Sequence, residues 1–465
     1  VLLRLAADSP QLVINTVLEL DAGNRAPKHN TLLFALAAVA GLADEEHRRA
    51  ALEAALQVAR TGTHLFTFLT YAEQFRGWGR GLRRFASSWY TTKEADALAY
   101  QLVKYRQRDG WTHRDVLRLA HPKGPTPEHD LLYAHTVGKG PSAGTLPKTF
   151  WDYEMVRRGN LTPAEGARAG LPWEALPTES LKDPAVWRAL IEADALPYTA
   201  TMRNLPRLTT LGLLDDHAVL SKVVRKLSDA REVKRGRVHP VNILVAARTY
   251  ASGRSARGDG SWTPKRAIVD ALDVAFYTAF GNVTPSGKRT LIALDVSGSM
   301  GSHIAGMPIT AREASAAMAL VTMATEEHVD VVAFTGNGFW SSATNITELA
   351  LSPRQRLDDV LRTVSALNFG RTDCALPMVW AGQQGRKYDA FHVWTDNETY
   401  AGRTHPFQAL RQYRAQSGID ARLVVAATTS TGFSIADPSD RGMLDVVGFD
   451  AAAPQLIADF SAGRI

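Results

Sequence analysis

The spacing of apolar residues changes once along this 465-residue chain, after the segment Val283–Gly287. Before that segment, apolar residues recur with the period of a helix. After it, short apolar runs typical of strands alternate with helical runs. A β-α-β-α order predicts a mainly parallel sheet covered by helices on both faces. The sequence therefore predicts a mainly α domain over residues 1–285 and a doubly wound, Rossmann-like α/β domain over residues 286–465.

The first domain consists of short amphipathic stretches joined by small loops. In the last of them, Thr263 is expected to cap a helix, Pro264 to begin it and Gly281 to end it. Such a series favours stacked helical pairs of the solenoid kind, although no clean repeat period is visible. The segment Pro122–Pro147, with five Pro and four Gly, is expected to be an exposed loop. The other helices are expected at Thr31–Leu42, Glu45–Arg60, Thr63–Phe75, Thr91–Asp109, Thr112–Leu119, Pro184–Glu192, Val219–Asp229 and Pro240–Ser252.

The second domain is expected to place ligands at the carboxyl ends of its strands, as doubly wound sheets do. The expected strands are Thr290–Val296, Val329–Thr335, Ala390–Thr395, Arg422–Thr428 and Leu444–Phe449. The expected helices are Pro308–Glu326, Pro353–Leu367, Pro406–Ala415 and Ala453–Phe460.

Oxygen-bearing side chains gather where two of these strands end. Asp295, Ser297 and Ser299 leave the end of the first strand, Thr372 lies in a loop, and Asp396 follows another strand. Five oxygen ligands without His or Cys suit a hard divalent cation, Mg²⁺ or Mn²⁺, at about 2.1 Å. A capped turn at the end of a strand, binding no metal, is the alternative.

The order D-x-S-x-S, loop Thr, strand-end Asp resembles the metal-ion-dependent adhesion site (MIDAS) of von Willebrand factor A (vWA) domains. In that family the two Ser and the Thr usually contact the metal, the two Asp often act through water, and one position accepts a partner's carboxylate. The resemblance implies direct contacts for Ser297, Ser299 and Thr372, and contacts through water for Asp295 and Asp396. Arg371 stands where the family often has a second Gly, and its charge can weaken cation binding or recruit an anionic partner.

Basic residues are concentrated in two blocks of the first domain. Residues 60–124 carry 12 Lys and Arg against 5 Asp and Glu, and residues 201–265 carry 13 against 5. Two such blocks favour binding to a polyanion such as RNA, with solvated helix faces as the alternative.

The first basic block interleaves cations with aromatic rings. This combination can hold phosphates and stack bases. The helical spacing of the rings Trp78, Phe85, Trp89 and Tyr90 favours core packing for them instead. The arginines that charge alone assigns to an RNA-binding surface are Arg80, Arg83, Arg84, Arg106, Arg114 and Arg118.

Several long motifs closely resemble, in the same order, the TROVE-module proteins related to the Ro autoantigen, of the bacterial type. They are GNRAPKHNTLLFALA, KYRQRDGWTHRDVLRLAH, RVHPVNILVAARTYASG and GKRTLIALDVSGSM, followed by RTDCALPMVWA and VWTDNET. The resemblance implies a ring of HEAT-like helical repeats closed by a vWA domain. It also implies binding of Y-like small noncoding RNA, and of misfolded or unprocessed RNAs whose single-stranded 3′ ends enter the ring. The positions that match the family's RNA-contacting cations are Lys104, Arg108 and His121, although His121 also suits a neutral core or cap histidine.

These features predict a non-enzymatic RNA-binding protein of a small ribonucleoprotein, acting in RNA quality control, maturation or decay, with an exoribonuclease or another protein as partner. A metal-dependent adhesion or protein-interaction module is the alternative. A metal-dependent nuclease is a further alternative, but hydrolysis asks for more carboxylates and a base, and Cys374 has no His nearby in sequence. The chain is expected to be monomeric. A cytoplasmic location is expected because a single cysteine fits a reducing compartment and no apolar run approaches the ~20 residues needed to cross a membrane.

Overall fold

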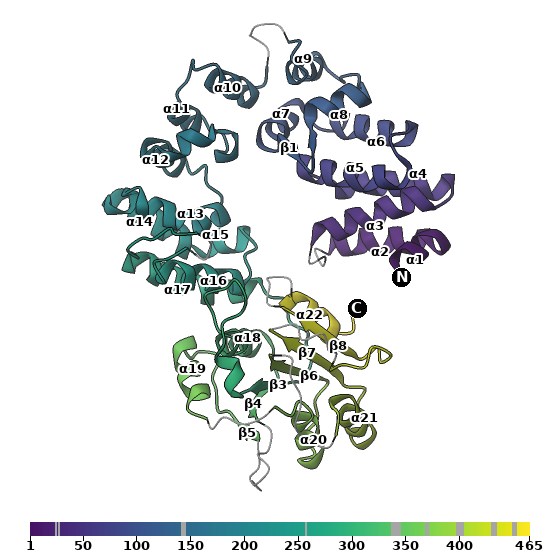
Figure 1. The fold of residues 1–465 in the computed structure, drawn as a ribbon, viewed down its shortest axis with the longest axis vertical. Helices are drawn as coiled ribbons and strands as arrows, with labels where there is room; N and C mark the ends of the chain where they lie inside the picture. The colour runs from purple at the N-terminus through teal and green to yellow at the C-terminus, as the bar shows by residue number, and fades with distance from the viewer. Residues whose placement is uncertain are drawn as a thin grey trace. The chain divides into compact units, whose positions relative to one another are not determined.

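The computed structural model describes residues 1–23, 26, 28–140, 146–255, 258–335, 346–367, 372–396, 404–428, 435–448 and 453–465. Within these residues the chain forms two compact units, Val1–Leu196 and Pro197–Ile465. The first unit is helical, and the second joins further helices to a six-stranded sheet (Figure 1).

The helices from α1 (Leu2–Asp8) to α8 (His113–Ala120) pack on one another in sequence order (Figure 1). α3 (His29–Leu42) packs against α4 (Glu45–Val58) and α5 (Gly62–Arg76), whereas α4 packs on α6 (Arg80–Thr91) and α6 on α8 (His113–Ala120). This alternation is the HEAT-like stacking that the sequence predicts. The remaining helices are α1 (Leu2–Asp8), α2 (Pro10–Ala22), α7 (Ala95–Lys104), α9 (Pro127–Thr136), α10 (Lys148–Arg157), α11 (Pro163–Arg168) and α12 (Pro184–Glu192), with 3-10 turns η1 (Trp173–Ala175) and η2 (Thr178–Lys182).

The prediction of one exposed loop over Pro122–Pro147 is wrong, because helix α9 forms inside it. Pro127 occupies the first turn of α9, where its missing N–H costs no helical hydrogen bond. Burial of His129 and Leu132 then holds the helix against its neighbours. Proline therefore begins a helix here and does not exclude one.

The prediction of one helix over Thr91–Asp109 is also wrong in its second part. The helix α7 ends early and is followed by β1 (Gln107–Arg108), which pairs antiparallel with β2 (Trp111–Thr112). Asp109 and Gly110 form the turn with φ of 51° and 83°. Asp-Gly is well suited to a two-residue hairpin turn with positive φ, so the turn overrides the helical period.

The second unit begins with five further helices: α13 (Tyr198–Thr210), α14 (His217–Ser228), α15 (Ala230–Arg235), α16 (Pro240–Ala251) and α17 (Arg266–Thr278), with 3-10 turns η3 (Leu213–Asp215) and η4 (Ala279–Asn282). The predicted apolar stripe of α17 is buried. However, α17 does not begin at Thr263 and Pro264 as predicted. Trp262 Nε1 donates to the carbonyl of Tyr250, 2.9 Å away, and this contact holds the preceding residues against α16.

The sheet has six strands in the order β5-β4-β3-β6-β7-β8, all parallel except the edge strand β5. The strands are β3 (Thr290–Asp295), β4 (Val329–Phe334), β5 (Ile346–Glu348), β6 (Ala390–Thr395), β7 (Arg422–Ala427) and β8 (Met443–Val447). Five of them are the predicted strands, and β5 is not among the predictions. From β3 the chain continues to β4 on one side and later to β6 on the other. The ends of β3 and β6 therefore flank a switch point of the topology, where doubly wound folds bind ligands.

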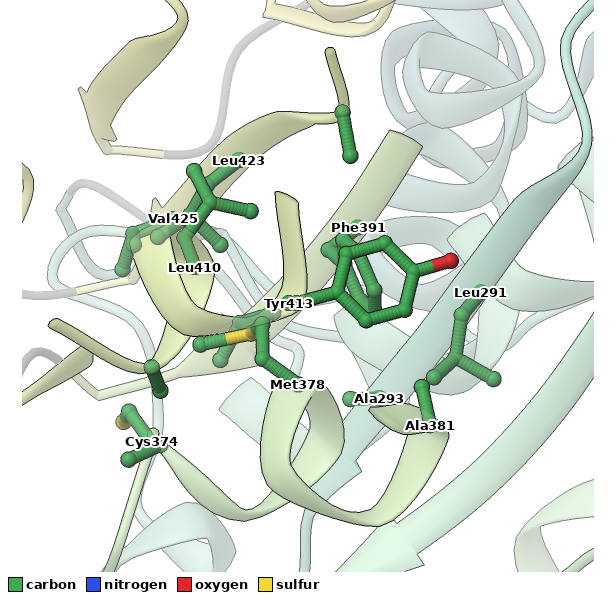
Figure 2. Packing of buried hydrophobic residues seen from close by; sticks show 14 of the residues in the cluster. Leu291, Ala293, Cys374, Met378, Ala381, Phe391, Leu410, Tyr413, Leu423 and Val425 are labelled. Carbon is green, nitrogen blue, oxygen red and sulfur yellow. The ribbon is translucent and has the colours of Figure 1, made fainter. Parts of the chain in front are cut away.

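Helices cover both faces of the sheet (Figure 1). α20 (Leu376–Gln383), which is not among the predicted helices, packs along α21 (Pro406–Ser417) over one face. Figure 2 shows the core beneath them, where Met378 and Tyr413 lie among side chains of β3, β6 and β7. The opposite face is covered by α18 (Ala311–Thr325) and α22 (Ala453–Ser461), and His392 Nε2 of β6 lies 2.7 Å from Ser461 Oγ there. α19 (Leu357–Ser365) packs on α18, and a 3-10 turn, η5 (Gly298–Gly301), follows β3.

The compact units divide the chain at Leu196–Pro197, which differs from the predicted boundary at 285/286. Arg248 of α16 links these helices to those that cover the sheet: its Nε lies 2.5 Å from Glu313 of α18, and its Nη2 lies 2.9 Å from Asp358 of α19. The fold class is confirmed as stacked helices joined to a doubly wound vWA-like domain. The closed ring and the domain boundary at 285/286 stay predictions. Within the described residues, no helix combines the length and apolar character needed to span a membrane.

Candidate functional site

Arg108 lies on the hairpin after α7 and is exposed. Its Nε is 3.4 Å from Asp109 Oδ1. The other oxygen of that carboxylate, Oδ2, accepts a hydrogen bond from Thr67 Oγ1 of α5 at 2.7 Å. Asp109 is therefore shared between the turn and α5. It anchors the hairpin, and the Arg108 guanidinium, whose side chain is 57% exposed, stays accessible to an anion.

Lys104 ends α7 between two tyrosines. Its Nζ donates to Tyr100 Oη at 3.0 Å, and it lies 5.3 Å and 5.5 Å from the ring centroids of Tyr100 and Tyr105. Partial burial alone would lower the pKa of Lys104, but the hydrogen bond to Tyr100 and the charge of Glu174 raise that pKa above its usual value. The ammonium is thus held in place and stays charged at neutral pH.

His121 lies at the other end of α8 from the hairpin. Thr112 and Asp115 form a capping box that begins the helix. The helix ends where His121, with φ of 48°, donates its backbone N–H to the Leu117 carbonyl at 3.0 Å. A left-handed conformation is uncommon outside Gly and a few polar residues. The imidazole is exposed, so His121 is a cap residue whose side chain is free to meet a ligand.

Six further arginines were predicted on the same surface, and five of them share one environment. These five are exposed on α6 and α8, and none forms an ion pair with another residue in the part of the chain that the structure describes. They are Arg80, Arg83, Arg84, Arg114 and Arg118. Arg106 differs, because its guanidinium donates to Tyr153 Oη at 3.3 Å and to the Glu174 carbonyl at 3.1 Å. It joins α7 to later elements although its side chain is exposed.

The aromatic residues between these arginines pack mainly in the core. Phe85, Trp89 and Tyr90 are buried, and Tyr90 Oη lies 2.7 Å from Nδ1 of the buried His113. Trp78 is half-buried beside Trp111, with ring centroids 5.7 Å apart. Phe85, Trp89 and Tyr90 therefore pack in the core, as their helical spacing favours, and are not available for base stacking.

The predicted metal ligands at the end of β3 form one hydrogen-bonded group. Asp295 is fully buried; its Oδ1 accepts from the Ser297 N–H at 2.8 Å, and its Oδ2 accepts from Thr395 Oγ1 at 2.8 Å. Ser297 Oγ and Ser299 Oγ are 3.2 Å apart. Parallel pairing of β3 with β6 brings Asp295 beside Thr395, which directly precedes Asp396. Hydrogen bonds thus join three of the five predicted ligands, and Asp396 lies close enough for its charge to act on Asp295.

Thr372, the fifth predicted ligand, is buried at the start of the segment that leads into α20. Two residues later, Cys374 is buried in the core beneath α20 and α21 (Figure 2). This packing anchors the loop residue, and it makes Cys374 a structural side chain. Arg371 lies outside the described residues.

Two oxygen atoms of the predicted set have no hydrogen-bond partner among the described residues: Thr372 Oγ1 and Asp396 Oδ1, both buried. Burial of such atoms without a partner is costly. Burial also raises the pKa of Asp295 to about 6, and the nearby charge of Asp396 adds to this shift. Oxygen atoms without partners and a carboxylate held away from water are the environment that a hard cation would satisfy.

The donor set consists of two carboxylates and three hydroxyls. Among the described residues, no group of three or more His, Cys, Asp or Glu side chains is arranged to hold a metal ion. A site here would therefore depend on hydroxyl ligands, which fits Mg²⁺ or Mn²⁺ better than a transition metal of higher affinity.

Sequence reasoning did not single out the residues that position these groups. Tyr100 lies four residues before Lys104 on α7, a spacing that places both on one helix face. Thr395, which donates to Asp295, directly precedes Asp396. The sequence positions of Tyr100 and Thr395 are consistent with these contacts, but a tyrosine or a threonine does not by itself predict a positioning role.

Comparisons with known proteins extend over both units. The family profile described as TROVE domain matches residues 5–140 and 145–249, and that described as Ro60 vWA domain matches residues 289–461. The chain is 41% identical over 469 residues to a protein named RNA-binding protein RO60 from Deinococcus radiodurans, covering 98% of this chain and 85% of that protein. It is 37% identical over 535 residues to a protein of the same name from Caenorhabditis elegans, covering 98% and 82%. The crystal structure of Deinococcus radiodurans RO (RSR) protein superposes with a TM-score of 0.89 at 39% identity, covering 100% of this chain and 93% of that one.

Proposed function

This chain belongs to the family of TROVE-domain proteins that carry a Ro60 vWA domain, and on that premise we propose that it is an RNA-binding protein. Its proposed ligands are Y-like small noncoding RNA, in a small ribonucleoprotein, and misfolded or unprocessed RNAs with single-stranded 3′ ends. We place it in the cytoplasm, in RNA quality control, maturation or decay beside an exoribonuclease. No catalytic step is assigned to the chain.

Three side chains around α8 carry this proposal: Arg108 and His121, which are exposed, and Lys104, which is half-buried. Lys104 and Arg108 flank the start of the hairpin, and His121 ends the helix. Hairpin turn, capping box and tyrosine contacts fix the backbone under all three side chains. A fixed cluster of cations loses little conformational entropy on binding phosphates, which favours tight binding.

The three side chains suit different contacts. The Arg108 guanidinium can bind a phosphate through two N–H groups, whereas the Lys104 ammonium acts as a point charge. The His121 imidazole can donate to a phosphate or a 2′-hydroxyl, or stack on a base. Such a set recognises the shape and backbone of an RNA more than its sequence, which suits a protein with several RNA ligands.

The test is equilibrium binding of the full chain to a hairpin RNA with a single-stranded 3′ tail, to its blunt counterpart and to duplex DNA, across a salt titration. The tailed hairpin is expected to bind most tightly. Its affinity should fall with salt with a log–log slope of about 0.7 for each phosphate contacted on a single strand. Weak and equal binding of the three nucleic acids would contradict the proposal.

A second proposal concerns the buried oxygen group: we infer that it holds Mg²⁺ or Mn²⁺ and presents it to a protein partner. The atoms Thr372 Oγ1 and Asp396 Oδ1, which have no hydrogen-bond partner among the described residues, support it. Ser297, Ser299 and Thr372 would contact the cation directly, with Asp295 and Asp396 acting through water. The cation would supply a Lewis-acidic position for a partner's carboxylate.

Thermal unfolding with and without Mn²⁺ tests the metal proposal without any assay of activity. Mn²⁺ at 100 times its Kd should stabilise the protein by about 2.7 kcal/mol. The variant Asp396→Asn should not respond to Mn²⁺, whereas Asp445→Asn, outside the predicted site, should respond like the natural chain. Equal responses of both variants would contradict the proposed ligand set.

A further inference from the structure

A groove runs between α4 and α6 on the first unit. It consists of two adjoining cavities of about 410 Å³ and 290 Å³, which share Arg48, Leu52, Arg80 and Gly81 as lining residues. The larger cavity falls in the size range of small-molecule sites. Neither the proposed RNA-binding cluster at α8 nor the metal group includes this groove.

The groove is lined by arginines that the fold does not use. Arg49, Arg76, Arg80 and Arg84 line the cavities, and none of them pairs with a carboxylate within the described ranges. Arg48 is the exception, because it donates to the carbonyls of Ala40 and Ala43. Two acidic residues also line the larger cavity, Glu45 and Glu53, but neither forms an ion pair with these arginines. The groove therefore carries a net positive charge of about +3.

The positions of the α6 arginines are not explained by helix stability. Arg80, Arg83 and Arg84 lie in the first turns of α6, where the helix dipole disfavours positive charge, and no acidic residue offsets them there. Substituting neutral residues would stabilise the isolated helix. Arginines that destabilise the start of α6 are better explained by a role in binding an anion than by a role in the fold.

The floor of the groove is apolar. Leu52 and Leu56 of α4 are half-buried, and Phe85 of α6 is buried beneath them. Gly81 leaves room above this floor, because a Cβ there would approach Leu52 Cδ1 to 3.2 Å. The groove thus combines an apolar seat with guanidinium groups at its rim.

From this combination we propose that the groove binds an unpaired nucleotide of a bound RNA, with the base against Leu52 and Leu56. The flanking phosphates would lie on Arg49, Arg80 and Arg84. This inference rests on the proposed RNA-binding function and adds a second contact to it.

The arrangement of α6 and α8 favours RNA over an acidic peptide as the occupant. α6 packs against α8 (Figure 1), and α8 carries the exposed Arg114 and Arg118. Exposed arginines without ion-pair partners among the described residues therefore lie on both of these packed helices, the second of which ends at His121. A polyanion that runs across both helices could contact the arginines of each, whereas a peptide confined to the groove would leave the α8 arginines without a role.

A variant that fills the groove without changing its charge provides the sharpest test. Gly81→Leu adds a side chain at an exposed helical position, and its tightest neighbour is the end of the Leu52 side chain, which can shift. Ala97→Leu, at an exposed position of α7, is the matched control. The probes are two hairpin RNAs with the same 3′ tail, one fully paired and one with a single bulged 4-thiouridine.

The bulged hairpin should bind Gly81→Leu about tenfold more weakly than the natural chain, in line with the worth of one base contact, while the paired hairpin should bind both equally. Ala97→Leu should behave as the natural chain. Irradiation should crosslink the 4-thiouridine to α4 or α6 in the natural chain, and this crosslink should disappear in Gly81→Leu.

Two outcomes would overturn the inference and leave the proposed function intact. In the first, the bulged RNA binds tightly and equally to both variants and crosslinks elsewhere. In the second, a glutamate-rich peptide binds the natural chain but not Gly81→Leu while RNA binding is unchanged, which would assign the groove to a protein. Failure of the natural chain to bind any of the RNAs would instead contradict the proposed function itself.

Discussion

The two candidate sites of this protein differ in the solvent exposure of their polar side chains. Around α8, the polar side chains of Arg108 and His121 are exposed, and hydrogen bonds hold the backbone beneath them. At the end of β3, Asp295, Ser297 and Thr372 are buried, and the oxygens Thr372 Oγ1 and Asp396 Oδ1 have no partner among the described residues. The first arrangement suits a large polyanion that arrives from solvent, and the second suits a small cation held by several oxygen ligands. Changes at the two sites should therefore have different consequences.

Reversing one charge at the exposed site should have the largest effect. Arg108→Glu is expected to lower the affinity for a tailed hairpin RNA on the order of 100-fold, because it removes a charge-assisted contact and adds repulsion. The measurement is equilibrium binding at fixed salt. Arg4→Glu, an exposed charge reversal on α1, should change the affinity by less than threefold. Equal losses in both variants would mean that net charge alone drives binding.

Removing a hydrogen bond at the buried site should lower stability instead. In Thr395→Val, Asp295 Oδ2 loses its donor at 2.8 Å, and the free energy of unfolding should fall by about 1–3 kcal/mol. Urea unfolding measures this change. Thr322→Val removes only a bond to the Met318 carbonyl within α18 and should cost less. RNA affinity should be unchanged in both variants, and a loss of RNA affinity in Thr395→Val alone would show that the two sites are coupled.

Acid should weaken the helical unit through His113. Burial lowers the pKa of His113 to about 3, whereas an unfolded histidine titrates near 6.5. Between these values the unfolded chain binds more protons, so stability falls as the pH decreases below about 6.5, by about 1.4 kcal/mol per unit for this residue. In His113→Gln the unfolding free energy should fall less steeply between pH 6.5 and 5. The difference in slope should approach about 1.4 kcal/mol per pH unit, which corresponds to one proton. An unchanged slope would contradict the buried neutral state.

The smallest predicted effect is a gain in stability. Thr372→Val replaces a buried hydroxyl that has no partner among the described residues with a methyl group of similar size. In EDTA this variant should be more stable than the natural chain by about 1 kcal/mol. With Mn²⁺ present the order should reverse, because the natural chain gains a ligand contact. Destabilisation in EDTA would show that the hydroxyl already has a partner.

The sequence predicts the elements of the sheet better than the turns of the helical unit. Five strands follow from apolar runs, because residues inside a parallel sheet are apolar on both faces. The short strand β5 carries no such run, since its residues Ile346, Thr347 and Glu348 are partly or fully exposed. In the helical unit, the turn residues Asp109-Gly110 end a helix early, and Pro127 begins one inside a predicted loop. The apolar period alone does not show whether the period or the turn residue decides the local structure.

The predicted ligand positions follow from motifs, whereas their supporting contacts do not. Asp295 and Asp396 are assigned from their places after strands, and strand pairing brings those places together. The groove that the guanidinium groups of α4 and α6 line depends on packing between helices that are separated in sequence. Only the structure shows which charged residues the fold already pairs, such as Arg106, and which it leaves for a ligand.

The most direct test of the central claim is the affinity of a tailed hairpin RNA for two matched triple variants. One changes Lys104, Arg108 and His121 to Ala, and the other changes the exposed Lys182, Arg4 and His217 to Ala. Because both lose the same charges, a loss of affinity of about 100-fold or more in the first and less than threefold in the second is the expected result. Equal affinities in the two variants would contradict the claim that the ends of α8 bind RNA.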